Sequence, residues 1–456
     1  MSKSVFTFRW LLLLGFLLGS SCMVSAQDAV LKRVQHIYEL FVAGQGDSIH
    51  AQLNKKMQEK VAPALFSDPI RQAEAMFGKL QSQGEWQKDV VQGIEIYYRD
   101  LKLERYNLRF LLAFDADGSI NTIRLMPIPA ESTSSVQAQP ADTTGIVERE
   151  ITVGAEGFRL PGTLTLPRAA SASPGRKLPC VILVHGSGPN DRDETIGPNK
   201  PFRDIAYGLA RRGIAVIRYD KRAKVYRAKG VPEGRELDYD TEAMDDAVVA
   251  VAQAKLLPEV AADSIYVLGH SLGGMLAPRI AQRVPDLAGI IILAGLARPL
   301  EDTLLDQYRY IFSLTGATAD TEKQLADLQA QMENVKKLDT AEFDEKVPLL
   351  MNLPASYWRM ALAYKPVEVA AGLKLPILVL QGERDYQVTM EDFGLWRFGL
   401  LRCKNASFKS YPKLNHLMQE GIGKATPMEY NRASPVALYV VEDIAEFVRR
   451  KSIKMD

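Results

Sequence analysis

The sequence predicts two parts, a small α+β domain followed by a larger α/β domain with a doubly wound, mostly parallel sheet and a helical lid insertion. Three observations support this prediction. The N-terminal part combines apolar residues at helical spacing with later β-rich stretches. A segment poor in large apolar residues follows it. Beyond that segment, short apolar runs alternate with amphipathic stretches, and the 47% hydrophobic content of 456 residues is enough for a core in each part.

The first 26 residues have the pattern of a signal peptide. Lys3 and Arg9 precede an apolar run from Trp10 to Leu18, and small residues end the segment at Ala26. The run is short against the roughly 20 residues that span a bilayer. We therefore expect cleavage, no transmembrane span in the mature chain, and a secreted or periplasmic protein. The alternatives are an uncleaved anchor and a lipoprotein modified at Cys22.

Charge and cysteine content exclude several classes of protein. Loss of Lys3 and Arg9 with the signal peptide changes the formal net charge from +1 to about −1, which favours neither nucleic acid nor acidic lipid as a partner. Cys180 and Cys403 are the cysteines left, and their placement indicates no disulfide framework. Cys180 lies in an apolar run without a cationic neighbour, so we expect a small buried hydrophobe.

Residues 27–128 are predicted to form the small α+β domain. Helical periodicity extends to about residue 80, with Pro63 and Pro69 as breaks. Three strands are expected after it, at Val90 to Tyr98, Leu103 to Phe114 and Ile120 to Met126. No triad residue or glycine-rich loop lies here. The domain is therefore expected to be accessory, either pairing two chains into a homodimer or narrowing access to a site elsewhere.

Residues 129–145 are predicted to be a linker, and residues 146–456 the α/β domain. Its expected strands are Pro179 to Val184, Ile214 to Arg218, Ser264 to Leu268, Leu287 to Leu293, Pro376 to Leu380 and Ser407 to Tyr411. Long polar helices interrupt this rhythm at about residues 298–373, notably from Asp320 to Lys337. A lid after the sixth strand is expected there, because long insertions in such sheets lie at the strand ends where sites form. The alternative is a surface excursion without function.

The strongest chemical motif is Gly269-His270-Ser271-Leu272-Gly273-Gly274. It follows the expected strand that ends at Leu268 and precedes a predicted helix from Leu272 to Arg283. A serine in this position must turn sharply, and small neighbours let the chain close while the hydroxyl projects above the sheet. The helix N-terminus also stabilises negative charge that develops near the serine. Ser271 is therefore the predicted nucleophile.

A serine hydroxyl needs a base to remove its proton, and the chain holds five histidines. His36 and His50 lie on helix-like segments of the first domain at no metal-ligand spacing. His185 and His270 belong to glycine motifs, and the side chain of His270 is expected to point away from the site. His416 remains, in a loop between the last predicted strand and the C-terminal helix. Position and elimination make His416 the predicted base.

The acid of a triad fixes the tautomer of the base and belongs at the carboxyl end of a strand. Asp385 follows the strand that ends at Leu380 and is our choice, which gives the chain order Ser, Asp, His. Glu383 is the near competitor, and Asp302 and Asp306 are the distant ones. A purely structural role for Asp385, as a helix cap, is the alternative.

Ester or amide hydrolysis also needs donors for a tetrahedral oxyanion. The run His185-Gly186-Ser187-Gly188 follows a predicted strand, where such a loop belongs. The backbone N–H groups of Ser187 and Leu272 are the expected pair. A dinucleotide site is excluded, because Asp191 stands where a third glycine would fall. The polar residues from Asn190 to Asp193 either shape the entrance or pair with one another.

Residues 146–456 resemble the α/β-hydrolase superfamily. The runs His185-Gly186-Ser187-Gly188-Pro189-Asn190-Asp191-Arg192-Asp193 and Gly269-His270-Ser271-Leu272-Gly273-Gly274 are similar to those of a bacterial secreted esterase group related to serine aminopeptidases and dienelactone hydrolases. The resemblance implies hydrolysis of carboxylic esters with short or medium acyl groups through an acyl-enzyme, on small-molecule substrates and with no metal or cofactor. Residues 28 to 128 resemble the small domain of unknown function, nuclear transport factor-like, that precedes such hydrolases.

Two other functions stay open at this point. A serine peptidase or aminopeptidase needs an acidic group for the substrate amine, and Asp191, Asp193 or a lid carboxylate would serve. No repeat of a gating propeller is present in the sequence. A non-catalytic binding protein on the same fold is the third interpretation, and the complete set of triad residues argues against it.

Overall fold

The computed structural model describes residues 30–452 except 60, 62, 68, 78, 92–93, 105–106, 128–141, 155–156, 172–174, 176 and 315–318. The predicted signal peptide, Cys22 and most of the predicted linker lie outside these residues. The chain divides into two compact units, unit 1 with residues 1–134 and 314–316, and unit 2 with residues 135–313 and 317–456. Each unit has hydrophobic clusters of its own.

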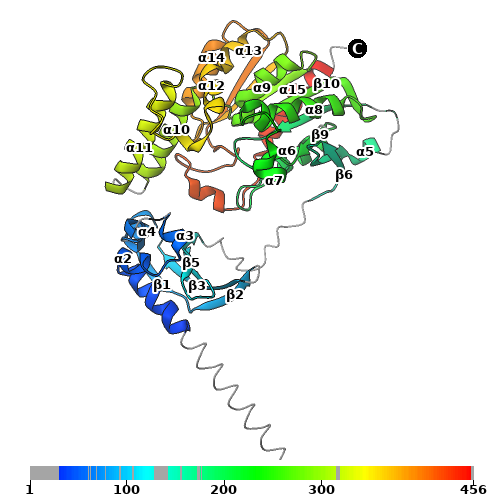
Figure 1. The fold of residues 1–456 in the computed structure, drawn as a ribbon. Coiled ribbons are helices and arrows are strands. Elements are labelled where there is room, and N and C mark those ends of the chain that lie inside the picture. The colour runs from blue at the N-terminus through cyan, green and yellow to red at the C-terminus, as the bar shows by residue number, and fades with distance from the viewer. Residues whose placement is uncertain are drawn as a thin grey trace, which may run out of the picture. The chain divides into compact units, whose positions relative to one another are not determined.

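Unit 1 packs helices against an antiparallel sheet (Figure 1). Residues 30–42 are helical. The further elements are α2 (Gly46–His50), α3 (Lys55–Gln58), η1 (Pro63–Phe66), α4 (Pro69–Phe77), β1 (Leu80–Gln83), β2 (Gln87–Val91), β3 (Ile94–Leu103), β4 (Asn107–Phe114) and β5 (Ile120–Pro127). The strand order is β1-β3-β4-β5, with β2 also paired to β3. Phe110 is fully buried at the centre of the core, 4.9 Å from Phe41 and 5.0 Å from Tyr38 between ring centroids.

Two of the strands predicted for unit 1 have wrong boundaries. The stretch from Val90 to Tyr98 belongs to two antiparallel strands, β2 and β3, with Val91 opposite Ile94. The stretch from Leu103 to Phe114 likewise contains the end of β3 and all of β4. Residues with high strand propensity continue through both chain reversals, between β2 and β3 and between β3 and β4. A prediction from composition alone therefore merged neighbouring strands into one. Gly93 in the sequence was the turn signal that the prediction passed over.

Unit 2 contains an eight-stranded sheet in the order β13-β12-β11-β10-β8-β9-β7-β6. Its strands are β6 (Ile146–Val153), β7 (Leu160–Pro167), β8 (Leu178–Val184), β9 (Ala215–Tyr219), β10 (Val260–His270), β11 (Gly289–Leu293), β12 (Ile377–Gly382) and β13 (Ala406–Tyr411). Strands β8 to β13 are paired in parallel, and only β7 runs against them. The predicted α/β class with a mostly parallel sheet is confirmed.

Helices cover both faces of this sheet (Figure 1). The helices of unit 2 are α5 (Arg168–Ser171), α6 (Pro201–Ala210), α7 (Arg222–Tyr226), η2 (Arg227–Gly230), η3 (Asp240–Met244), α8 (Asp245–Ala254), α9 (Leu272–Arg283), α10 (Leu300–Ser313), α11 (Ala319–Lys336), η4 (Leu350–Asn352), α12 (Ala355–Ala363), α13 (Pro366–Ala371), α14 (Met390–Gly399), η5 (Pro427–Asn431) and α15 (Leu438–Ser452). Side chains of α6 and α15 pack on one face and those of α8, α9 and α14 on the other.

The alternation along β8 shows why the strand is apolar throughout. Val181 and Leu183 pack with α6 and α15, whereas Cys180 and Ile182 pack on the opposite face. A strand buried on both faces has no solvent side for polar residues. Cys180 is fully buried, and burial raises the pKa of its thiol to about 12.

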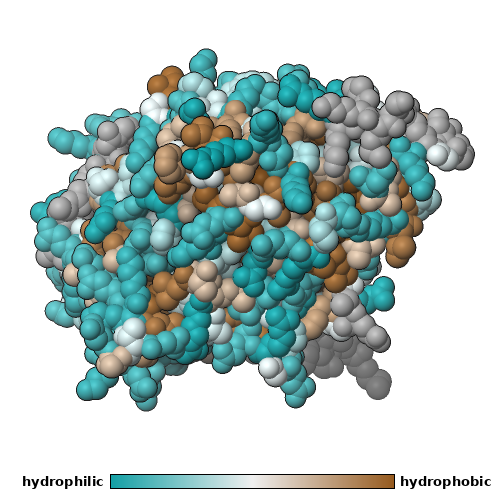
Figure 2. Space-filling model, turned by 90° about the horizontal axis from the view of Figure 1, so that it is seen from above, coloured by the Kyte–Doolittle hydropathy of each residue, from teal (hydrophilic) through white to brown (hydrophobic). Residues whose placement is uncertain are grey.

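The insertion expected at residues 298–373 lies between β11 and β12 and contains α10 to α13. Helix α11 matches the predicted polar helix within one residue, and it lies beside α10 (Figure 1). Within the described residues, no helix has the length and apolar character that crossing a membrane requires. The face drawn in Figure 2 is mainly hydrophilic, with apolar residues in separate groups.

Candidate active site

The predicted site residues follow four strands of the sheet in unit 2. Gly186 follows β8, Ser271 follows β10, Asp385 follows β12 and His416 follows β13. These strands run in parallel, so their carboxyl ends lie at one edge of the sheet. Binding sites of open parallel sheets form at this edge. The topology therefore brings together residues that are far apart in the sequence.

Ser271 has a strained backbone at the junction of β10 and α9. Its φ is 53° and its ψ is −117°, a conformation that costs a non-glycine residue energy. The Ser271 N–H donates to Leu293 O at 3.0 Å, which fixes the turn to the neighbouring strand. Ser271 is the N-cap of α9, yet its side chain makes no capping hydrogen bond. The hydroxyl is therefore not held by the helix that it begins.

The turn depends on a close approach at Gly273. A Cβ atom on this residue would lie 2.2 Å from Val184 O and 2.7 Å from His185 O. Both oxygens are backbone atoms, so no side chain can move aside. The absence of a side chain at Gly273 thus lets the start of α9 pack against the segment that leads into the predicted oxyanion loop.

His416 and Asp385 form a buried pair. His416 Nδ1 lies 2.6 Å from Asp385 Oδ2, and the side chains are 5% and 0% exposed. Asp385 Oδ1 accepts hydrogen bonds from the N–H groups of Gln387 at 2.8 Å and Val388 at 3.1 Å. Gln381 Nε2 donates to Oδ2 at 3.2 Å. Because Nδ1 faces the acid, Nε2 is the ring nitrogen of His416 left for other chemistry.

The other carboxylates considered from the sequence have different partners. Glu383 is exposed and accepts a hydrogen bond from Ser410 Oγ at 2.7 Å. Asp302 pairs with Lys336 at 2.6 Å, and Asp306 pairs with Arg298 at 2.8 Å. The structure brings Asp385 to His416, and it brings none of the three competitors there.

The predicted oxyanion loop lies against the nucleophile. A Cβ atom on Gly186 would lie 3.2 Å from Ser271 Cβ. The N–H of Gly186 donates to Glu194 Oε1 at 2.7 Å, and its carbonyl oxygen accepts from Lys221 Nζ at 2.8 Å. Ser187 is exposed, and Leu272 is the first residue of α9. Both expected donors therefore flank Ser271, and their role stays a prediction.

A second histidine and carboxylate lie next to this site, and no motif in the sequence predicts their contact. His270 Nδ1 is 2.8 Å from Glu194 Oε2, and His270 Nε2 is 3.0 Å from the carbonyl oxygen of His416. Both ring nitrogens thus lie close to oxygen atoms, and the contact of Nδ1 has the distance of an ion pair without hydrogen-bond geometry. Burial is the largest single influence and lowers the pKa of His270, but the charge and close contact of Glu194, the carbonyl group of His416 and the charge of Asp385 together outweigh it, so the pKa lies above its usual value. Glu194 lies in the polar segment after the glycine loop, and none of its sequence neighbours indicates that it contacts a histidine.

The polar residues from Asn190 to Asp193 pair mainly with other segments. Arg192 contacts Asp220 at 3.2 Å, and Asp193 contacts Arg218 and, at 3.0 Å, Lys200. From the sequence, these residues were expected either to shape the entrance of the site or to pair with one another. The ion pairs instead tie the loop after β8 to the rest of unit 2.

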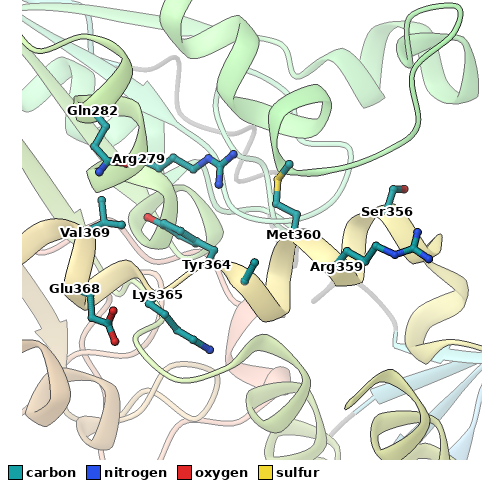
Figure 3. Close-up of a pocket in the computed structure, with 10 residues that line it drawn as sticks. Arg279, Gln282, Ser356, Arg359, Met360, Tyr364, Lys365, Glu368 and Val369 are labelled. Atoms are coloured by element: carbon teal, nitrogen blue, oxygen red, sulfur yellow. The ribbon is translucent and has the colours of Figure 1, made fainter. Parts of the chain in front are cut away.

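A pocket in unit 2 lies away from the predicted catalytic residues. It has a volume of about 660 Å³ and lies between α9, α12 and α13 (Figure 3). Arg279, Arg359 and Lys365 line it together with Glu368. The guanidinium of Arg279 lies 5.7 Å from the ring centre of Tyr364. Within the described residues, no group of His, Cys, Asp and Glu is arranged to hold a metal ion.

Comparison with known proteins identifies the family. The family described as serine aminopeptidase, S33, matches residues 180–420. Esterase EstD of Thermotoga maritima is 36% identical over 363 residues, which cover 80% of this chain and 82% of that protein. The chain belongs to the serine aminopeptidase S33 family. The predicted relation to this group of hydrolases is therefore confirmed.

Solved structures similar to this family member include other esterases. Est1E from Butyrivibrio proteoclasticus is 18% identical, with a TM-score of 0.41, over 67% of this chain and 98% of that one. The Pyrobaculum calidifontis esterase is 17% identical, with a TM-score of 0.42, over 67% and 86%. The predicted likeness of residues 28 to 128 to the nuclear transport factor fold stays a prediction.

Proposed function

We propose that this protein is a serine esterase that hydrolyses carboxylic esters with short to medium acyl chains. Three observations support this proposal. His416 and Asp385 form a buried pair, and Ser271 has a strained backbone beside a glycine loop. The sequence is also 36% identical to that of a protein named as an esterase. The observation that carries most of the argument is the pair at 2.6 Å, because a histidine so oriented can act as a general base.

The proposed reaction passes through an acyl-enzyme. His416 Nε2 takes the proton of the Ser271 hydroxyl as Oγ attacks the ester carbonyl carbon. The tetrahedral intermediate collapses, the alcohol leaves with that proton, and the acyl group remains on Oγ. Water activated by His416 then attacks the acyl carbon and releases the acid. Asp385 stabilises the imidazolium in both halves and holds its orientation.

The negative oxygen of the intermediate is bound in this proposal by the N–H groups of Ser187 and Leu272. The first N–H groups of a helix have no partner within the helix, and Leu272 is the first residue of α9. The partial positive charge of the helix N-terminus acts in the same direction. Gly186 brings the Ser187 peptide next to Ser271. Neither donor requires a metal.

An apolar wall beside His416 and Asp385 suits a small acyl or alcohol group. Leu417 and Tyr386 follow the two residues directly in the chain, and they cluster with Tyr430 and Tyr310. The rings of Tyr310 and Tyr386 are 5.2 Å apart and those of Tyr386 and Tyr430 are 6.3 Å apart. Tyr310 belongs to α10, so we propose that the insertion acts as a lid that contributes to substrate binding.

Aminopeptidase activity is the second candidate, favoured by the family's description. It needs a free carboxylate for the substrate amine. Asp193 is neutralised by Arg218 and Lys200, and Asp191 Oδ1 accepts hydrogen bonds from the N–H groups of Asp193 and Thr195. These two acids are thus occupied, which favours the ester as substrate.

A substrate panel separates the two activities. Nitrophenyl esters of rising acyl length and aminoacyl nitroanilides are compared by kcat/KM on the wild-type protein. We expect the highest values for acetyl to hexanoyl esters, and values for the anilides at least a hundredfold lower. Anilide hydrolysis equal to ester hydrolysis would replace the esterase by the peptidase.

We further propose that the chain is exported and cleaved near residue 26, and that unit 1 pairs two chains. The charged, apolar and small-residue order of the N-terminus supports export. The mass of the mature protein tests the proposed cleavage: an N-terminus near Gln27 is expected, whereas a diacylated Cys22 would make the protein a lipoprotein.

Sedimentation of the mature protein, with and without unit 1, tests the homodimer.

A further inference from the structure

Lys221 is a buried cation behind the predicted oxyanion loop. Its side chain is 2% exposed. Strand β9 is paired in parallel with β8, and Ile217 lies opposite Ile182. Lys221 and Gly186 each come four residues after these partners, so they leave the sheet side by side. A buried lysine without a partner costs much free energy, and its contacts therefore indicate its role.

The ammonium group of Lys221 holds the carbonyl group of Gly186. Nζ donates to Gly186 O at 2.8 Å and to Glu242 Oε1 at 2.7 Å. Asn190 Nδ2 donates to the same carbonyl oxygen at 3.2 Å. The N–H of Gly186 is held separately, by Glu194 Oε1 at 2.7 Å. Both polar groups of Gly186 are thus fixed by buried charges.

The orientation of this carbonyl decides the orientation of the next N–H group. In a trans peptide, the carbonyl of one residue and the N–H of the next point in opposite directions. The bond between Gly186 and Ser187 is trans. With its oxygen directed at Lys221, the peptide directs the Ser187 N–H to the opposite side. A cation at the oxygen also polarises the peptide, which makes that N–H a stronger donor.

We propose that Lys221 is a positioning residue for ester hydrolysis, which orients and polarises the Gly186–Ser187 peptide so that the Ser187 N–H binds the oxyanion. The inference rests on the proposed function and names a residue that neither triad nor glycine motif contains. Because the oxyanion exists only in the transition state and the intermediate, Lys221 acts on kcat and leaves substrate binding nearly unchanged.

The insertion supports this arrangement through Tyr357, which contacts Glu242. Glu242 lies in η3, a π-helical turn, and Tyr357 lies on α12. The hydroxyl of Tyr357 donates to Glu242 Oε2 at 2.7 Å while Oε1 accepts from Lys221. Tyr357 is 3% exposed. A chain of partly buried hydrogen bonds therefore joins α12 to the predicted oxyanion loop.

The test removes the cation without leaving a buried charge behind. Lys221→Met combined with Glu242→Gln neutralises both partners at similar volume. We expect kcat for nitrophenyl acetate to fall about 10- to 100-fold, with KM changed by less than about threefold. The matched control is Arg222→Met with Asp246→Asn, a neighbouring buried pair at 2.5 Å. It removes a comparable ion pair from the same segment, and its kcat should stay within about threefold of wild type.

A second measurement does not depend on ester turnover. A fluorophosphonate places its phosphoryl oxygen in the oxyanion site as Ser271 Oγ bonds to phosphorus, fluoride leaves and His416 takes the hydroxyl proton. Intact mass gives the rate. We expect the Lys221 and Glu242 double variant to be phosphonylated about 10- to 100-fold more slowly than the control. If wild type reacts with the fluorophosphonate but cleaves no ester, the proposed function fails, and a slowed double variant still supports Lys221.

The inference is overturned if the double variant and the control have the same kcat and the same phosphonylation rate, or if only KM rises. Tyr357→Phe provides a second test in case the double variant does not fold. This variant removes only the hydroxyl group that donates to Glu242, so it is a much smaller change. We expect it to lower kcat about two- to fivefold at unchanged KM. Unchanged kcat in Tyr357→Phe, together with a double variant that does not fold, also overturns the inference.

Discussion

At the scale of single residues, the proposed mechanism makes Ser271 and His416 one functional unit. Ser271→Ala should lower kcat by roughly 10⁴- to 10⁶-fold, leaving the rate that binding and oxyanion contacts alone provide. His416→Ala should lose about as much by itself as together with Ser271→Ala, because neither residue works without the other. Turnover of a nitrophenyl ester measures both. Losses that multiply in the double variant, or a tenth of wild-type activity in Ser271→Ala, would contradict the assignment.

The acid can be tested by two conservative changes on one loop. Asp385→Asn keeps the shape of the side chain but favours the wrong tautomer of His416, so kcat should fall by about 10³- to 10⁴-fold with an unchanged circular dichroism spectrum. Glu383→Gln serves as the control, since this exposed side chain contacts Ser410 and should change kcat by less than threefold. The reverse ranking would transfer the role to Glu383.

The pair of His270 and Glu194 predicts a pH dependence of stability. The pKa of His270 is raised in the folded state, so its contribution is fully present below the unfolded pKa of about 6.5 and is lost as pH rises through the folded pKa. For Glu194, burial is the largest single influence and raises the pKa, but the charges of His270 and His185, the close contact of the His270 ring and the hydrogen bond from the Gly186 N–H together lower it below its usual value. The contribution of Glu194 to stability is therefore present above the pKa of an unfolded glutamate and is lost as pH falls through the lowered folded pKa.

Urea unfolding of wild type and His270→Gln, followed by tryptophan fluorescence, measures this dependence. The stability advantage of wild type should be greatest near pH 5.5 and should shrink toward pH 9. Glu194→Gln should show the same trend, because it removes the other member of the pair. An advantage that is constant with pH, or that increases toward pH 9, would show that His270 is not charged in the folded protein.

The residues that the sequence could identify are those whose chemistry is marked locally. Ser271 stands between a strand and a helix, and His416 was left after the other histidines were assigned to motifs or to the first domain. Glu194, His270 and Lys221 contact partners that are distant in sequence, for example Lys221 Nζ, which donates to Gly186 O. A charged side chain that will be buried looks like a surface residue until tertiary packing supplies its partner. The supporting contacts of the site therefore required the structure.

At the scale of helices and strands, the sequence predicted best the elements whose ends carry their own signals. Helix α9 runs from Leu272 to Arg283, as predicted from the motif that precedes it. Strands β6 and β7 were not predicted individually. Three consecutive charged residues lie in the middle of β6, and two prolines and a glycine interrupt β7, so neither has the continuous apolar run of the parallel strands. Their pairing as a hairpin at the sheet edge explains this composition.

Two glycines in helices give opposite predictions for the same substitution. Gly273→Ala places a methyl group 2.2 Å from Val184 O, so we expect a loss of about 1–3 kcal/mol or more in the free energy of unfolding, with reduced activity. Gly394→Ala in α14 meets no atom within 4 Å and should gain about 0.5–1 kcal/mol from helix propensity. Chemical denaturation compares the two. A stable and active Gly273→Ala variant would show that the close packing of this turn is not required.

At the scale of the whole molecule, two units with separate hydrophobic clusters predict separable folding. Deletion of residues 27–140 should leave unit 2 folded, by far-UV circular dichroism, and able to cleave nitrophenyl acetate at a rate within about threefold of the full chain. Unit 1 would then affect dimerisation or the hydrolysis of bulky esters. A folded but inactive unit 2 would mean that unit 1 supplies part of the site.

In the proposed mechanism, the side chain of Ser271 serves catalysis and makes no capping hydrogen bond, so activity and stability make opposite demands on this residue. A serine at the start of a helix usually accepts a hydrogen bond from the first turn and contributes about 1 kcal/mol. Here the backbone of Ser271 has a positive φ, the hydroxyl makes no capping hydrogen bond, and the strained conformation itself costs free energy. A change that relaxed the turn would therefore make the protein more robust and less active at once. In the proposed mechanism, the strained turn is retained because it presents the nucleophile, and the hydrophobic core that packs against α9 offsets its cost in stability.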